Sequence, residues 1–290
     1  MMDPNLVVLA GGISSRMRKS SNRLLDPALQ RDAEEKSKSL IGVGEGSRPF
    51  LDYLLYNAEA SGYRDVVIVV GEHDKAMREY YGPEDRDNAF HRLSISYAVQ
   101  RIPAGRTKPL GTADALFQAL RLRPDWQGKK FTVCNSDNLY SQRALGLMLE
   151  SRAECALIDY DRDALRFESE RVRQYAVVCK DHQGRLLEIV EKPSKEEFAR
   201  IGSAEGRVGV SMNIFRFLYE RVFRFLELVP LNPVRQEKEI PAAVMMMIQA
   251  VPGCMEAIPL AEYVPDLTNR DDIAIVREYL QREYGNFVWR

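Results

Sequence analysis

The chain has 290 residues, of which 45% are hydrophobic and 29% charged, an ordinary composition for a globular protein with a large apolar core. Its 41 basic and 42 acidic residues give a formal net charge of −1, so no overall field attracts nucleic acid or an anionic membrane surface. No apolar run is long enough to span a membrane, and the first residues lack the regions of a signal peptide. We therefore expect a cytoplasmic protein that binds neither nucleic acid nor membranes.

The cysteines and histidines show no metal-binding spacing. Cys134, Cys155, Cys179 and Cys254 are far apart in the sequence, and the C-x-x-C pattern is absent. Cys134 and Cys179 end apolar runs, where a thiol packs as a small hydrophobic group. We expect free cysteines, no zinc site and no catalytic histidine.

The first half of the chain alternates short β-rich runs with helical stretches, which predicts an α/β fold with a mainly parallel sheet. Strands are expected at residues 5–10, 65–71, 94–100 and 130–138, and helices at residues 47–63 and 112–122. Ligands of such a sheet bind at the carboxyl ends of the strands. The polar loops that follow these strands are therefore the candidate site.

The second half is more mixed. Strands are expected at 154–161, 174–181, 186–193 and 208–217, and helices at 218–228, 241–251 and 269–285. The turn at 181–185 joins the middle two strands into a hairpin. The Met-rich run of the second helix indicates core packing. We expect one domain over residues 1–290, with a charged insertion at 18–37 that forms a mobile, partly helical loop.

The segment LAGGISSRM (9–17) ends the first strand in two glycines, followed by hydroxyls and an arginine. Gly11 and Gly12 carry no side chain, so backbone N–H groups can approach phosphate oxygens or a base. Arg16 can make a forked contact with a phosphate. The pattern is neither G-x-G-x-x-G nor the Walker motif, which disfavours a dehydrogenase or a P-loop NTPase. An ordinary tight turn is an equal alternative.

Further motifs follow this segment in order. They are KSLIGVGEGSRPFLDYLLYNAEASGYRDVVIVVGE (38–72), QRIPAGRTKPLGTADAL (100–116), CNSDNLY (134–140), GRLLEIVEKP (184–193) and VGVSMNIFRF (208–217). Together they resemble the sugar-phosphate nucleotidyltransferase family over nearly the whole chain. The resemblance implies a doubly wound, mainly parallel Rossmann-like sheet with helices on both faces, of the glycosyltransferase-A type. It also implies a Mg²⁺-assisted attack of a sugar 1-phosphate on the α-phosphorus of a nucleoside triphosphate (NTP), which gives an NDP-sugar and pyrophosphate.

The resemblance assigns the nucleotide side of the site to residues up to about 140. It makes Arg16 the signature arginine and Lys38 the signature lysine, with Lys36 as a near competitor. It gives base recognition to Gln100, whose amide carries a donor and an acceptor together. Thr112 can cap the helix that follows it, and the N-terminus of that helix would then face the nucleotide. The predicted nucleotide-binding residues are Ala10, Gly11, Gly12, Gln100, Gly111 and Thr112.

Asp137 is the predicted Mg²⁺ ligand, because it follows the apolar run FTVC in the loop at a strand's carboxyl end. An Asx turn is the alternative. In the half from about 141 to 290, the resemblance gives sugar hydroxyls to Glu191 and the sugar phosphate to Lys192, which acts with Arg16 and Lys38 as a catalytic cation. A surface ion pair explains Glu191 and Lys192 equally well. Asn213 lies in an apolar run and is expected to be a buried amide, by resemblance a ligand on the sugar or metal side.

Some features depart from the family pattern. The insertion at 18–37 separates Arg16 from Lys38, and no clear second acidic metal ligand is present. Glu239, Asp271 and Asp272 are candidates, although the last two are expected to cap the final helix.

The acceptor and the class of protein also stay open. A phosphorylated alcohol such as phosphocholine can replace the sugar phosphate as acceptor. The alternative to an enzyme is a non-catalytic regulatory protein that binds a nucleotide sugar. No hexapeptide repeat follows, so acyltransferase activity is not expected. The sequence names neither the base nor the sugar, and a homo-oligomer is compatible with it.

Overall fold

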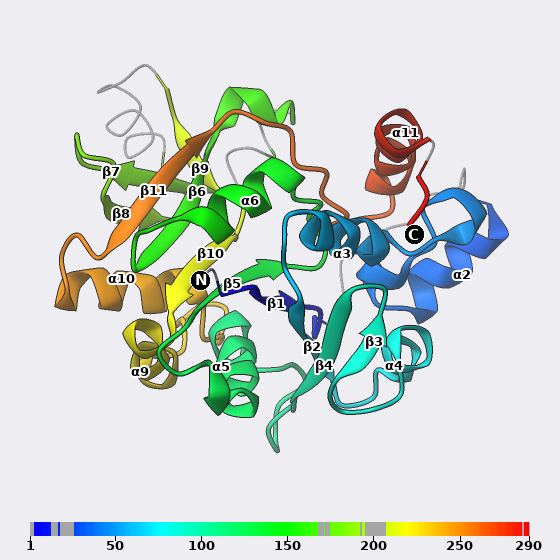
Figure 1. The fold of residues 1–290 in the computed structure, drawn as a ribbon, viewed down its shortest axis with the longest axis horizontal. Coiled ribbons are helices and arrows are strands. Elements are labelled where there is room, and N and C mark those ends of the chain that lie inside the picture. Colours follow the sequence, from blue (N-terminus) through cyan, green and yellow to red (C-terminus); the bar gives the residue numbers. More distant parts are fainter. Residues whose placement is uncertain are drawn as a thin grey trace.

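The computed structural model describes residues 3–12, 17, 26–167, 171, 175–191, 193–194, 207–285 and 287–289. At its centre lies a mixed sheet (Figure 1). The strands are β1 (Asn5–Leu9), β2 (Asp65–Gly71), β3 (Asn88–Phe90), β4 (Leu93–Gln100), β5 (Lys130–Asn135), β6 (Cys155–Asp161), β7 (Ala176–Lys180), β8 (Leu186–Val190), β9 (Gly209–Ser211), β10 (Phe215–Leu218) and β11 (Met255–Leu260). This eleven-stranded sheet has the order β3-β4-β2-β1-β5-β10-β6-β9-β7-β8, and β11 pairs with β6 off this path.

Four strands of the first half run parallel to one another. β1 lies between β2 and β5, and β4 joins the other side of β2. The apolar runs of β1 and β2 are buried on both faces, which is typical of a parallel sheet with two covered sides. β10 then runs antiparallel between β5 and β6 and joins the second half to the first. Because the longest ladders are parallel, the predicted fold class is confirmed.

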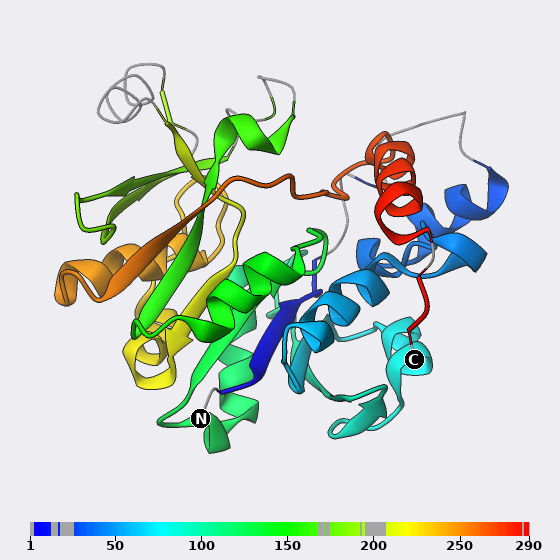
Figure 2. The same ribbon diagram turned by 45° about the horizontal axis from the view of Figure 1, so that its top comes forward.

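Helices cover both faces of the sheet (Figures 1 and 2). They are α2 (Pro27–Glu35), α3 (Phe50–Ala60), α4 (Lys75–Tyr81), α5 (Thr112–Leu122), α6 (Gln142–Glu150), α9 (Tyr219–Leu228), α10 (Ile240–Ala250) and α11 (Asp272–Tyr284). Apolar side chains of α3, α6 and α11 share one buried cluster with Leu6 and Val8 of β1, whereas those of α5, α9 and α10 share another with Val7. The alternation along β1 therefore divides the core into two layers.

The run 208–217 differs from its prediction as one strand. It forms β9 and β10, which are separated at Asn213, where the backbone has a positive φ of 58°. Asparagine tolerates this left-handed conformation better than most residues. The side chain of Asn213 is exposed, so the expectation of a buried amide was wrong. The break lets β9 pair with β6 and β7 while β10 pairs with β5 and β6.

Part of the charged insertion is helical. Asp26 accepts hydrogen bonds from the backbone N–H groups of Ala28 and Leu29 and so caps α2. Leu29 and Ala33 bury the inner side of this helix against the core. After α2, a single 3₁₀ turn, η1 (Lys38–Leu40), turns the chain back toward the sheet. The residues of the insertion from 18 to 25 lie outside the described part of the chain.

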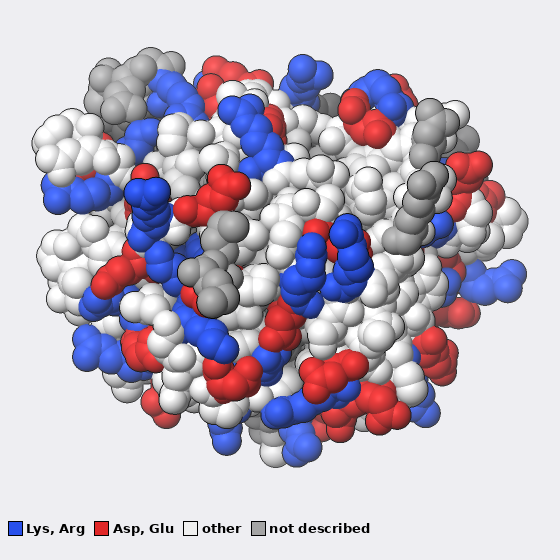
Figure 3. Space-filling view, in the orientation of Figure 1, with Lys and Arg blue, Asp and Glu red and all other residues white. Residues whose placement is uncertain are grey.

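Other sequence predictions can be compared directly with the structure. β7 and β8 form the predicted antiparallel hairpin. All four cysteines are free, as expected, and Cys134 and Cys155 are fully buried. No helix among the described residues is long and apolar enough to cross a membrane. On the face that Figure 3 shows, basic and acidic side chains are interspersed, in agreement with the balanced charge.

Candidate active site

A pocket of about 410 Å³ opens where β1, β4 and β5 end. Every predicted nucleotide-binding residue lines it, together with Lys38 and Asp137. The full lining is Leu9, Ala10, Gly11, Gly12, Lys38, Ser39, Gln100, Lys108, Pro109, Gly111, Thr112, Ala115, Asn135, Ser136, Asp137 and Glu237. The volume is within the usual range for small-ligand sites. Segments far apart in the sequence therefore meet at one edge of the sheet, as the parallel strands require.

Lys38 and Asp137 form an ion pair in this pocket. The Nζ atom of Lys38 lies 3.0 Å from Oδ2 of Asp137, and only 13% of the lysine side chain and 26% of the aspartate side chain are exposed. The competing Lys36 instead pairs with Asp32 at 2.7 Å, one helical turn before it, and is 43% exposed. The geometry thus favours Lys38 over Lys36 as the lysine of the site.

Asp266, which was not predicted from the sequence, lies beside Asp137. The N–H of Leu267 donates to the carbonyl oxygen of Asp137 at 2.8 Å, and Asn138 and Asp266 form an isolated antiparallel bridge. Burial, and next the negative charge of Asp137, raises the pKa of Asp266, against hydrogen bonds from Thr268 and Arg171. The two carboxylates therefore act on each other electrostatically.

The earlier candidates for a second acidic ligand are engaged elsewhere. Glu239 accepts hydrogen bonds from Asn232 and Arg235. Asp272 accepts the N–H groups of Thr268 and Asn269, both at 2.8 Å, and so holds the turn before α11. Asp271 occupies the N-cap position of this helix but makes no side-chain capping hydrogen bond, so the expectation that these two residues cap the final helix was wrong. Asp266 is the acidic neighbour of Asp137, although it is not itself part of the pocket lining.

Each of these two carboxylates has a cationic partner. Lys38 pairs with Asp137, and Arg171 donates to Asp266 at 2.9 Å and also to Asp272. Within the described residues, no three His, Cys, Asp or Glu side chains are grouped as a complete metal site. Asp137 and Asp266 can thus supply part of a cation's oxygen ligands, and phosphate oxygens or water must supply the rest.

Gln100 is the last residue of β4, and its amide is almost fully buried. Nε2 donates to the carbonyl oxygen of Gly111 and to Oδ2 of Asp114, both at 2.8 Å. The donor that we expected this amide to offer a base is therefore already used inside the protein. A Cβ atom built on Gly11 would lie 3.4 Å from Oε1 of Gln100, so the carbonyl oxygen is the part that faces the glycine segment.

Thr112 does not cap α5, so this prediction was wrong. Gly111 occupies the N-cap position, and Thr112 is already the first helical residue. Its Oγ1 atom accepts the backbone N–H of Ile240 at 3.1 Å, which is one of the unpaired donors at the start of α10. The threonine therefore fastens α10 to the pocket wall, while the N-terminus of α5 still borders the pocket.

Gly111 has φ 112° and ψ −174°, a backbone conformation that is essentially restricted to glycine. A Cβ atom here would also lie 2.5 Å from the carbonyl oxygen of Lys238. We expect Gly111→Ala to destabilise the fold by about 2–4 kcal/mol and to weaken nucleotide binding, since the Gly111 carbonyl holds Gln100. Gly105→Ala is the matched control, because Gly105 has φ 80° but open space around its Cβ position. Equal losses of melting temperature in both variants would contradict the importance of the Lys238 contact.

On the acceptor side, Glu191 follows β8 and forms an ion pair with Arg235 at 3.2 Å. Arg235 also pairs with Glu239. The backbone carbonyl oxygen of Arg235 accepts a hydrogen bond from Lys108 of the pocket at 2.6 Å. Glu191 is not part of the pocket lining, and neither is Asn213. Their roles toward an acceptor stay predictions. Arg16 and Lys192 lie outside the described residues.

Several pocket residues were not predicted. Most lie inside motifs that the sequence did single out, namely Ser39 in KSL, Lys108 and Pro109 in RTKPLG, and Asn135 and Ser136 in CNSDN. Glu237 is different, because it comes from the loop between α9 and α10 and pairs with Lys108 at 2.7 Å. No local pattern marks this loop as part of a site.

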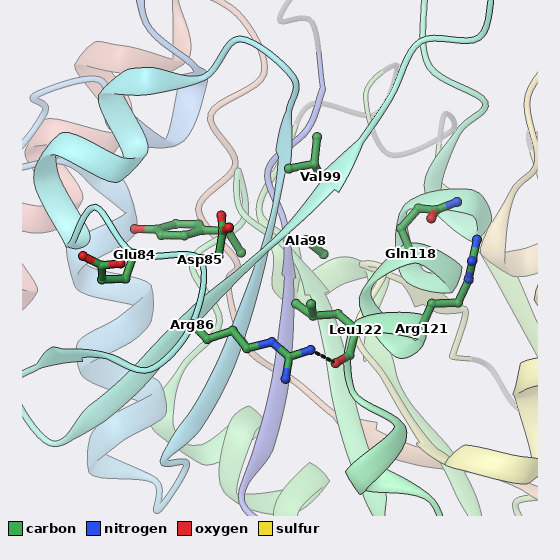
Figure 4. A pocket seen from close by; sticks show the side chains of 9 residues that line it. Glu84, Asp85, Arg86, Ala98, Val99, Gln118, Arg121 and Leu122 are labelled. Carbon is green, nitrogen blue, oxygen red and sulfur yellow. Dashed lines mark hydrogen bonds between the residues drawn. The ribbon is translucent and has the colours of Figure 1, made fainter.

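A second, more open hollow lies on another part of the molecule (Figure 4). It has a volume of about 780 Å³ and is lined by Glu84, Asp85, Arg86, Tyr97, Ala98, Val99, Gln118, Arg121 and Leu122. Arg86 donates a hydrogen bond to the carbonyl oxygen of Leu122 at 2.8 Å and so connects two segments that line the hollow. None of the predicted site residues that the structure describes lines this hollow.

Several known proteins are similar to this chain in sequence. The family model for nucleotidyl transferases matches residues 6–251. The glucose-1-phosphate adenylyltransferase of Rhodospirillum rubrum is 26% identical over 240 residues, which cover 79% of this chain and 51% of the relative. The bifunctional protein GlmU of Symbiobacterium thermophilum is 29% identical over 138 residues, covering 48% and 22%. GlmU of Staphylococcus saprophyticus is 23% identical over 249 residues, covering 86% and 46%.

The chain spans about half the length of the curated adenylyltransferase relatives that it matches. The family match itself extends from β1 to the start of the segment after α10 and includes every strand that contributes to the pocket. The chain therefore belongs to the nucleotidyl transferase family.

Proposed function

We propose that this protein transfers a nucleotidyl group from an NTP to a sugar 1-phosphate. A phosphate oxygen of the acceptor attacks the α-phosphorus, and the bond from that phosphorus to the oxygen that bridges the α- and β-phosphates breaks, so that this oxygen leaves with the pyrophosphate. The products are an NDP-sugar and pyrophosphate. The main support is that the glycines, Lys38, Gln100 and Asp137, predicted from separate motifs, line one pocket.

The pocket suits a nucleotide in several respects. Gly12 has open space where a Cβ atom would be, so a ligand can approach the backbone there. Gly111 and Thr112 bring the N-terminus of α5 to the pocket, where the helix dipole favours negative charge. Lys38 adds a cation within the same lining. Catalysis of this transfer then depends on orienting the phosphates and neutralising their charge.

Magnesium is the cofactor that we propose for this site. The residues fit it, because Asp137 and Asp266 are neighbouring carboxylates on joined segments and Mg²⁺ prefers such oxygen ligands while retaining water and phosphate oxygens. When bound, the ion would neutralise phosphate oxygens and so make the α-phosphorus easier to attack. Lys38, released from Asp137, would be available to the phosphates as a second source of positive charge.

The acceptor is proposed to bind toward the second half, next to Glu191. Arg235 holds this carboxylate from the loop that also contacts the nucleotide pocket. A non-sugar phosphorylated acceptor such as phosphocholine uses the same phosphate chemistry and is the second candidate.

The test is release of pyrophosphate from each of the four common NTPs with Mg²⁺, against a panel of sugar 1-phosphates and phosphocholine. Thermal shifts with each NTP show binding separately from turnover. We expect one NTP to stabilise the protein in a Mg²⁺-dependent manner, and pyrophosphate to form only with an acceptor present. Binding of an NDP-sugar without any turnover would instead indicate a regulatory protein.

Lys192→Ala tests the acceptor side. We expect this substitution to raise the KM for the sugar phosphate by about tenfold or more, since a charge-assisted contact to phosphate is lost, with little change in the KM for the NTP. Steady-state kinetics with each substrate varied in turn measure this difference. An unchanged dependence on the sugar phosphate would assign Lys192 to the surface.

A further inference from the structure

The amide of Gln100 is held between two groups that can only accept hydrogen bonds. One is the carbonyl oxygen of Gly111 and the other is the carboxylate of Asp114, each 2.8 Å from Nε2. A flipped amide would direct its oxygen at both acceptors at once. The partners therefore fix which end of the amide faces inward.

Both acceptors are themselves held in place. The Gly111 carbonyl also accepts the N–H of Ala115 at 3.0 Å, as the first hydrogen bond of α5. Asp114 lies in the first turn of α5, where the helix dipole stabilises its negative charge. Its other oxygen accepts a hydrogen bond from Gln118 at 3.2 Å. The orientation of Gln100 is thus built into the start of this helix.

The consequence concerns Oε1 of Gln100, which faces Gly11 in the nucleotide pocket. This oxygen can accept a hydrogen bond from a ligand, and the amide offers no donor beside it, because Nε2 already donates to Gly111 and Asp114. A nucleobase edge with an N–H group can satisfy it, whereas an edge with only lone pairs would repel it. A buried group left unpaired costs more than the pair contributes when formed.

We propose that Asp114 is a positioning residue for base recognition. It fixes the Gln100 amide so that the pocket offers the base an acceptor, and the bound base must direct an N–H group at Oε1. This inference rests on the proposed function, since it presumes that an NTP occupies the pocket. It extends the role of Gln100 from general base contact to a defined hydrogen-bond direction.

The test compares the NTP that the protein uses best with an analogue that lacks the N–H on the base edge. Suitable pairs are ATP with purine riboside triphosphate, UTP with 3-methyl-UTP, and CTP with zebularine triphosphate. GTP has two kinds of N–H on this edge and is compared with both 1-methyl-GTP, which lacks the N1–H, and ITP, which lacks the N2 amino group. The measured quantity is the ratio of kcat/KM within the pair. We expect the unmodified protein to prefer the natural NTP by about tenfold or more.

Four substitutions separate positioning from packing. Asp114→Leu removes one of the two acceptors that hold Nε2 and leaves the Gly111 carbonyl, so it should reduce the preference by about threefold or more; Asp114→Ala, a smaller change, serves if the leucine variant does not melt cooperatively. Asp114→Asn keeps an acceptor oxygen for Gln100 and should restore the preference. Gln118→Leu alters the other side of Asp114 without touching Gln100, and should leave the preference intact.

The outcomes are distinct. A leucine or alanine variant that melts cooperatively and keeps the full preference would overturn the positioning role. Equal use of an NTP and its analogue by the unmodified protein would overturn the inference while leaving the nucleotidyl transfer standing. Failure to bind or use any NTP would overturn the proposed function as well.

Discussion

Asp137→Asn is expected to lower the turnover number by about two to three orders of magnitude. The substitution keeps the size of the side chain but removes the negative charge that Lys38 faces at 3.0 Å and that we propose binds Mg²⁺. Because Asp137 is partly exposed at the end of β5, the fold should remain intact. Initial rates of pyrophosphate release across a Mg²⁺ titration, with thermal melting of the same samples, measure both effects.

Asp163→Asn is the control for this change, because it removes the same charge from a side chain that is 76% exposed and is not part of the pocket lining. It should leave both the rate and the Mg²⁺ dependence unchanged. Near-normal turnover of the Asp137 variant would remove this residue from the proposed metal site.

Asp266→Asn should reduce turnover by about a hundredfold and shift the Mg²⁺ requirement to higher concentration. This residue differs from Asp137 because Arg171 and Thr268 hold it in a buried position. Loss of its charge should therefore also lower the melting temperature, since Arg171 loses one of its two carboxylate partners. Mg²⁺ binding by calorimetry in the presence of the preferred NTP gives a measure that does not depend on catalysis.

Asp272→Asn is a matched control, because Asp272 is the other carboxylate that pairs with Arg171. Asp272→Asn should lower the melting temperature in the same way but leave the Mg²⁺ affinity unchanged. If both variants shift Mg²⁺ binding equally, the effect comes from Arg171 and not from a ligand at Asp266.

The nucleotide side of the site could be predicted from the sequence for a physical reason. Gly11, Gln100 and Asp137 each directly follow or end a β-rich run, and the carboxyl ends of parallel strands meet at one edge. Local patterns are enough to locate these residues, because the strands themselves carry them to the pocket. The same reasoning predicted most helices and strands of the first half.

What the sequence could not indicate depends on contacts between distant segments. Asp266 reaches Asp137 only through pairing of two loops that are far apart in the chain. Thr112 looked like a cap of its own helix, but its hydroxyl serves α10 instead. The strand breaks at Asn213 because its backbone has a positive φ, which the apolar pattern of the run does not indicate. The strand β11 and the helix α6 were not identified either.

The segment before α10 is attached to both sides of the proposed reaction centre. Lys238 donates its N–H to the carbonyl oxygen of Leu110 at 2.5 Å and accepts the N–H of Ala113 at 3.0 Å, while Arg235 holds Glu191. A shift of either wall therefore strains the same short stretch of backbone. Occupancy of one substrate site should consequently alter the affinity of the other, and linkage requires this influence to be equal in both directions.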